Sequence, residues 1–169
     1  MMNMNYDETM NRELTMKRAW AMPNALTFSI RPIRELIARY GFSESGKVLL
    51  DPFCRESPFK RFCVSNDLDP DIPADFHMDA LDFLEMHGPA SADGVLFDPP
   101  YSPRQVSECY REMDRVVNMQ TTQASFWGNL KKEIARVLRP GGVCITCGWN
   151  SGGVGKGLGM ELAEVLLVA

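Results

Sequence analysis

Several features that would take the chain out of the class of ordinary globular proteins are missing from it. No apolar run among its 169 residues reaches the roughly 18 to 20 residues needed to span a bilayer. The N-terminal stretch has neither the apolar segment nor the small-residue cleavage site of a signal peptide. Hydrophobic residues make up 45% and charged residues 24%, which is typical of a soluble domain. We therefore expect a cytoplasmic protein of about one domain, without membrane contact.

The chain contains few cysteines, and their number is odd. Five cysteines in a chain without an export signal indicate reduced thiols. Cys144 and Cys147 have CxxC spacing, but no second CxxC or HxxxH follows to complete the four ligands of a structural zinc site. Both fall within a predicted strand, where a thiol serves as a small apolar side chain. The sequence thus favours core packing over metal or redox use, and we predict no metal.

An excess of basic residues is lacking as well. The formal net charge is −4, whereas binding to phosphates usually leaves a basic footprint. Residues 44–98 contain twelve acids and four bases, and residues 103–139 contain seven bases and four acids. The second segment is therefore either a set of solvated helix faces or a surface that contacts nucleic acid.

What the chain does contain is a series of short apolar runs that alternate with helical patterns. The runs suit strands buried on both faces of a parallel sheet. They are KVLLD (47–51), FCVSND (62–67), DFHMD (75–79), GVLFD (94–98) and VCITCGW (143–149). Helices are predicted over 32–40, 80–87, 103–117 and 123–138, the last ended by Arg139-Pro140-Gly141-Gly142. This alternation predicts an α/β doubly wound, mostly parallel sheet over residues 23–169, after a loose lead-in or marginal helix in residues 1–22.

Four of these runs end in aspartate: Asp51, Asp67, Asp79 and Asp98. Open α/β sheets bind ligands at the carboxyl ends of their strands, so these side chains are expected to gather at one edge. Each aspartate could instead cap a following helix, and this alternative is strongest for Asp79.

The most distinctive motif is Asp98-Pro99-Pro100-Tyr101. Two prolines directly after a buried strand remove two N–H donors. The Asp98 carboxylate and the Pro99 carbonyl are then left as acceptors beside the aromatic ring of Tyr101. This arrangement suits an amino group on a flat heterocycle.

The stretch GVLFDPPYSPRQVSECY resembles the catalytic region of S-adenosylmethionine (AdoMet)-dependent amino-methyltransferases, above all the adenine-specific DNA methyltransferases of phages and prophages. The resemblance implies a class I, Rossmann-like methyltransferase fold and methyl transfer to adenine N6 in DNA, with AdoHcy as product. It also implies that Asp98 and Pro99 bind the amino group and that Pro100 belongs to the same catalytic motif. Tyr101 would stack on a base flipped out of the duplex. The reaction would use no metal and no covalent enzyme intermediate.

The resemblance extends to the cofactor positions. LTFSIRPI is similar to the segment that lies over the methionine part of AdoMet, and LLDPFC to the first cofactor motif. Asp67 matches the acid that binds the ribose hydroxyls, and Asp79 the acid that accepts the cofactor's adenine amino group. The cofactor-binding residues implied in this way are Phe28, Pro32, Asp51, Pro52, Phe53, Asp67, Leu68, Asp79, Ala80 and Asp98.

Two departures from the family pattern stand out. Arg55, Glu56 and Ser57 occupy positions where most members have a glycine-rich loop. The run EVLLVA (164–169) closes the sequence where the family adds a seventh, antiparallel strand, so we expect the sheet to lack its last strand. A partner chain or a second copy would then cover this edge.

A separate target-recognition domain is not expected, so DNA contacts fall to Arg104, Gln105 and Lys156. Lys156 lies in a glycine-rich loop (151–159) that suits either a flap over the substrate or a surface turn.

Adenine in RNA and cytosine N4 in DNA are the alternative targets. The alternative that is not an enzyme is a non-catalytic subunit acting with a partner. Methylation of a protein amide fits less well, because the related enzymes have asparagine in place of Asp98.

Overall fold

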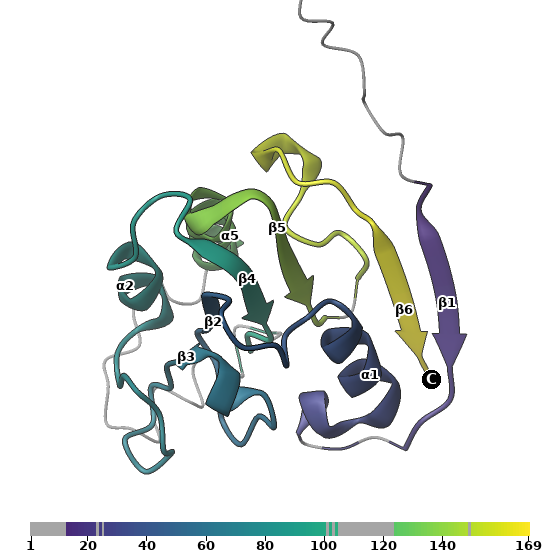
Figure 1. Cartoon of the computed structure of the whole chain (residues 1–169), viewed down its shortest axis with the longest axis horizontal. Coiled ribbons are helices and arrows are strands. Elements are labelled where there is room, and N and C mark those ends of the chain that lie inside the picture. The colour runs from purple at the N-terminus through teal and green to yellow at the C-terminus, as the bar shows by residue number, and fades with distance from the viewer. Residues whose placement is uncertain are drawn as a thin grey trace, which may run out of the picture.

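The structure, a computed structural model, describes residues 13–22, 24, 26–100, 102, 104, 124–148 and 150–169. They form an α/β fold with parallel strands (Figure 1). Its elements are β1 (Thr15–Ala19), η1 (Thr27–Ser29), α1 (Arg31–Arg39), β2 (Leu49–Asp51), η2 (Lys60–Phe62), β3 (Val64–Ser65), α2 (Ala80–Glu85), β4 (Ala92–Phe97), α5 (Ala124–Val137), β5 (Leu138–Thr146), η3 (Lys156–Leu158) and β6 (Glu164–Val168). Within the described ranges no helix has the length and apolarity to cross a membrane.

The larger sheet has four parallel strands in the order β3-β2-β4-β5. After β2 the chain adds β3 on one side and later adds β4 on the other side, so the strand order reverses between β2 and β4. In open α/β sheets such a reversal opens a crevice at the carboxyl ends of the two strands. The fold is thereby compatible with a Rossmann-like arrangement.

Both faces of this sheet are covered by helices. Val95 and Phe97 of β4 pack in one apolar cluster with α2 and α5, whereas Leu96 between them packs in a second cluster with α1. Alternate residues of a strand point to opposite faces, so a strand buried on both sides reads as an unbroken apolar run. The prediction of an α/β fold with a parallel sheet is therefore confirmed.

A second, two-stranded sheet joins the two ends of the described chain. β1 pairs in parallel with β6, from Thr15 opposite Glu164 to Ala19 opposite Val168 (Figure 1). The loose lead-in or helix predicted for residues 1–22 is thus wrong for residues 15–19. Four of the five residues of β1 are exposed, so its sequence carries no signal of a buried strand. The terminal apolar run is not bare, because β1 covers one of its edges.

Glu164 links this small sheet to α1. Its side chain is only 8% exposed, and its carboxylate accepts hydrogen bonds from Arg39 at 2.7 Å and from the Tyr40 hydroxyl at 3.1 Å. Lys17 of β1 lies 3.2 Å from the same carboxylate. The Glu164 carboxylate therefore holds β1, β6 and the end of α1 together.

Two predicted strand boundaries differ from the structure. The run 75–79 contributes only a single bridge between Asn66 and Phe76. Pro140 and the two glycines after it lie inside β5 instead of before it, because α5 passes directly into β5. They form an irregularity, with Gly141 at φ 80°, where the pairing of β4 with β5 shifts register. A proline and glycines can be accommodated in a strand at such a bulge.

Candidate functional site

Asp51 and Asp98 lie at the reversal of strand order. Asp51 is the last residue of β2 and Asp98 directly follows the neighbouring strand β4. Asp51 is fully buried, and its Oδ1 accepts a long hydrogen bond of 3.4 Å from the Phe53 N–H. Its Oδ2 is buried and has no hydrogen-bond partner within the described part of the chain. Because an unsatisfied buried acceptor is destabilising, this oxygen marks a place where a donor or a cation would be stabilised.

The ionisation of Asp51 reflects this setting. Burial raises the pKa of Asp51 to about 7, the Phe53 N–H and the Ser57 hydroxyl oppose the shift, and the nearby Asp98 and Asp67 carboxylates add to it. The carboxyl is therefore balanced between its neutral and ionised forms near neutral pH. A cationic group bound beside it would favour the ionised form.

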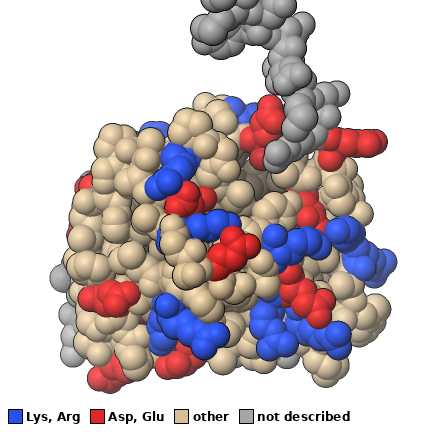
Figure 2. All heavy atoms as spheres, in the orientation of Figure 1, with Lys and Arg blue, Asp and Glu red and all other residues tan. Residues whose placement is uncertain are grey.

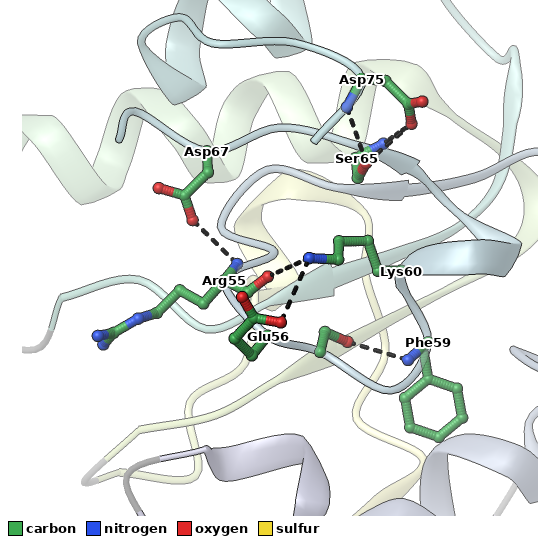
Figure 3. Close-up of polar contacts among 8 residues, drawn as sticks. Arg55, Glu56, Phe59, Lys60, Ser65, Asp67 and Asp75 are labelled. Atoms are coloured by element: carbon green, nitrogen blue, oxygen red, sulfur yellow. Dashed lines mark hydrogen bonds and ion pairs between the residues drawn. The ribbon is translucent and has the colours of Figure 1, made fainter. Parts of the chain in front are cut away.

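Asp67 connects the loop after β2 to the end of β3 (Figure 3). Its side chain is 8% exposed, and its Oδ2 accepts a hydrogen bond from the Arg55 N–H at 2.9 Å. Its Oδ1 accepts another from the Asp69 N–H at 3.0 Å. The acid thus organises the backbone at the carboxyl edge of two neighbouring strands.

The loop after β2 has no glycine, but it adopts a turn that favours glycine. Arg55 has φ 40°, in the left-handed region, and its side chain points away from Asp67 (Figure 3). Lys60 Nζ donates to the Arg55 carbonyl at 2.9 Å, and the Phe59 N–H donates to the Ser57 hydroxyl at 3.2 Å. Side-chain contacts therefore hold a backbone turn that glycine would adopt with little strain.

Replacing Arg55 tests this conformational cost. A residue with a Cβ loses roughly 1 to 2 kcal/mol in the left-handed region, which glycine avoids. We expect Arg55→Gly to have a free energy of unfolding about 1 kcal/mol higher than Arg55→Ala, because the two variants differ only in the Cβ. Urea denaturation at pH 7 would measure the difference, and equal stability of the two variants would contradict it.

Asn66 was not singled out from the sequence. It is 1% exposed, and its Nδ2 donates to the carbonyls of Pro52 at 3.2 Å and Met78 at 3.0 Å. Its Oδ1 accepts a hydrogen bond from the Met78 N–H at 3.1 Å. This amide joins three segments at the carboxyl edge. The sequence feature that could have indicated Asn66 is its position directly before Asp67, at the polar end of the run 62–67.

Asp79 caps α2, the alternative that the sequence left open. Its Oδ1 accepts a hydrogen bond from the Leu81 N–H at 3.1 Å, and Ala80 is the buried first residue of the helix. A contact from Asp79 or Ala80 to a cofactor stays a prediction.

The other predicted cofactor positions divide into two groups. Pro52 is buried at the carboxyl edge, the half-buried ring of Phe53 lies 6.0 Å from that of Phe97, and Leu68 is half-buried after Asp67. Phe28, only 4% exposed, packs inside the cluster on the α1 side, and Pro32 lies in the first turn of α1. No described contact joins these two residues to Asp51.

The motif after β4 is described through Pro100. Pro99 is buried, and the carbonyl of Pro100 accepts a hydrogen bond from Trp127 Nε1 of α5 at 3.0 Å. Tyr101 and Gln105, predicted to bind the substrate, lie outside the described residues. The other two predicted DNA contacts are both exposed, Arg104 in the short segment after the motif and Lys156 in η3.

The CxxC pair is split between the two faces of the sheet. Cys144 packs against the cluster on the α2 and α5 side, and Cys147 against the cluster on the α1 side. Burial raises the pKa of Cys144 to about 12 and also raises that of Cys147. The two thiols are therefore protonated and do not converge on one ligand. In the described segments no three His, Cys, Asp or Glu side chains form a group that could hold a metal ion.

The surface charges are mixed on the face that Figure 2 shows. Lys and Arg alternate with Asp and Glu there and do not gather in a patch of one sign. Much of the basic segment 103–139 lies outside the described residues, so its role stays a prediction.

Comparison with models of protein families, with curated proteins and with solved structures finds no match for this chain.

Proposed function

We propose that this chain transfers a methyl group from AdoMet to the exocyclic N6 of adenine in DNA. The observation that carries the proposal is the buried Asp51, with its unpartnered Oδ2, next to Asp98 at the reversal of strand order. The sequence that follows Asp98 is the proline pair of the amino-methyltransferase motif. The strand order and the parallel pairing are compatible with a class I methyltransferase sheet.

The residues at the carboxyl edge fit AdoMet chemically. AdoMet has a sulfonium and an ammonium group, and a buried carboxylate oxygen without a partner is suited to such a cation. Asp67, which accepts only two backbone hydrogen bonds in the described contacts, retains acceptor capacity for ribose hydroxyls. When bound, AdoMet supplies the electrophilic methyl group.

The motif after β4 supplies acceptors for the target base. The Asp98 carboxylate and the Pro99 carbonyl accept the two N–H bonds of the adenine amino group, and neither proline offers a competing donor. Both hydrogen bonds orient the nitrogen and increase the electron density on it. Asp98 also takes the proton that this nitrogen releases after methylation, and AdoHcy leaves as the second product. Tyr101 is assigned to stack on the flipped base.

A non-catalytic subunit is the competing function. The net charge of −4 and the loop in which Arg55 replaces glycine favour it. The buried, unpartnered oxygen of Asp51 favours a ligand-binding enzyme instead, because a purely structural domain gains nothing from that destabilising group. Measurable binding of AdoMet by the purified protein would separate these two functions.

Asp67→Ala tests the assignment of the cofactor site. We expect its Kd for AdoMet to rise about 10- to 100-fold, because hydrogen bonds to a charged acceptor contribute roughly 1.5 to 3 kcal/mol. Isothermal titration calorimetry would measure the change. Asp69→Ala is the matched control, since the Asp69 carboxylate accepts only a backbone hydrogen bond from Asp71 in the next turn. Equal affinities in both variants would contradict the role of Asp67.

The target is decided by the modified nucleoside. The protein would be incubated with tritiated AdoMet and, separately, with mixed-sequence duplex DNA, single-stranded DNA and RNA, and each product digested to nucleosides. We expect the label in N6-methyladenine from DNA. Label in N4-methylcytosine, or in RNA alone, would replace the proposed target by one of its two alternatives.

A further inference from the structure

A hydrogen bond from α5 fixes the peptide that follows the proline pair. The indole Nε1 of Trp127 donates to the carbonyl of Pro100 at 3.0 Å. The ring is half-buried, packs against the cluster on the α2 and α5 side, and lies edge-to-face on Phe126 with centroids 5.4 Å apart at 87°. The donor is therefore part of a packed helix surface and is held in place before any ligand binds.

The contact restrains the one soft backbone angle that Pro100 retains. The pyrrolidine ring fixes φ of a proline near −65°, so the direction of the chain beyond Pro100 depends mainly on its ψ. A hydrogen bond to the Pro100 carbonyl sets the orientation of that peptide group, and hence ψ. The contact therefore anchors the end of the Asp98–Pro100 segment on α5.

The same contact gives the carbonyl of the second proline a partner on α5. Neither proline has an N–H, so no backbone donor within the pair can satisfy their carbonyls. Trp127 engages the Pro100 carbonyl. By the proposed function, the Asp98 carboxylate and the Pro99 carbonyl, on the same short segment, accept the two N–H bonds of the target amino group.

We propose that Trp127 is a positioning residue for methyl transfer. It acts through the Pro100 carbonyl and holds the segment that carries Asp98 and Pro99 against α5. The inference rests on the proposed function. It gives a residue of α5, which lies outside the motif, a role in the reaction.

The test separates the indole N–H from the bulk of the ring. In Trp127→Phe we expect kcat on duplex DNA to fall about tenfold, since a lost hydrogen bond is worth about 1 kcal/mol and misplacement adds to it. The Kd for AdoMet is expected to stay within about twofold of the parent, because Trp127 is not assigned to the cofactor. Trp20→Phe is the matched control, since Trp20 lies just beyond β1 and is 82% exposed. It should leave both constants unchanged.

A second variant guards against a packing defect in Trp127→Phe. Benzothienylalanine at position 127 keeps the shape of the indole but replaces the N–H by sulfur, so it should lower kcat to a similar extent. An indole proton of Trp127 that exchanges slowly with D2O would support the hydrogen bond without any assay of activity. An active parent with equally active position-127 variants would overturn the inference and leave the proposed function standing. A parent that methylates no nucleic acid would overturn both.

Discussion

Asp51→Asn is expected to unfold at a higher urea concentration than the parent at pH 8 and to lose most of its affinity for AdoMet. Asp51 is fully buried, its Oδ2 has no partner among the described residues, and burial raises its pKa to about 7. At pH 8 the folded protein must therefore keep a buried charge that only the Phe53 N–H and the Ser57 hydroxyl offset in part. The asparagine side chain has the same shape and no charge.

The sign of the pH dependence follows from proton linkage. The pKa of Asp51 is higher in the folded protein than the ordinary value of 3.8, so the folded state binds more protons between these values. The stabilising contribution of the protonated Asp51 carboxyl is therefore fully present below pH 4 and is lost as the pH rises to about 7. The full shift corresponds to about 4 kcal/mol at pH 8. We expect Asp51→Asn to recover about 2 kcal/mol of it, because the amide brings two donors into a buried place.

Urea denaturation at pH 5 and pH 8 would measure this effect. The stability of the parent should fall between these pH values relative to that of Asp51→Asn. Asp93→Asn is the control with the opposite expectation, because the Asp93 carboxylate is paired with Arg139 at 2.9 Å and also accepts the Val48 N–H at 2.8 Å. If Asp51→Asn is less stable than the parent at pH 8, the buried charge of Asp51 does not destabilise the folded protein.

Asp98→Ala is expected to lower kcat for methyl transfer by about a thousandfold, the upper end of the loss seen when a group aimed at the developing charge is removed. The variant loses the acceptor that orients the amino group and takes its proton. Asp98 lies just beyond β4, and its removal leaves the apolar residues of that strand in place. We therefore expect a folded protein whose Kd for AdoMet stays within about threefold of the parent.

Asp98→Asn is the matched variant. It keeps the shape and one acceptor oxygen but cannot take a proton, so its rate should lie between that of the parent and that of Asp98→Ala. Single-turnover measurements at saturating AdoMet would isolate the chemical step. A large loss of AdoMet affinity in Asp98→Ala would reassign the residue from the target base to the cofactor.

The central sheet was predictable because its strands are buried on both faces. A run such as GVLFD has no helical spacing and ends in an acid, which indicates both the strand and the side of the sheet where Asp98 lies. The approach of Asp51 to Asp98 follows from topology once β2 and β4 are neighbours. The burial of Asp51 and its unpartnered oxygen were not predictable, since they depend on how the loops after several strands close over the edge.

The features that sequence reasoning missed depend on contacts between distant segments. β1 is mostly exposed and is held by pairing with β6, almost 150 residues away, so its own residues do not indicate a strand. The left-handed turn at Arg55 is stabilised by Asp67 and Lys60, so the residues of the turn alone do not indicate it. The cap formed by Asp79 was foreseen as an alternative, because a helix follows it directly.

The most direct test of the proposed function is the transfer of tritium-labelled methyl groups from AdoMet to mixed-sequence duplex DNA, with nucleoside analysis of the product and Asp98→Ala alongside. We expect label in N6-methyladenine with the parent protein and background label with Asp98→Ala. Equal transfer by both proteins, or a parent that neither binds AdoMet nor transfers a methyl group, would contradict it.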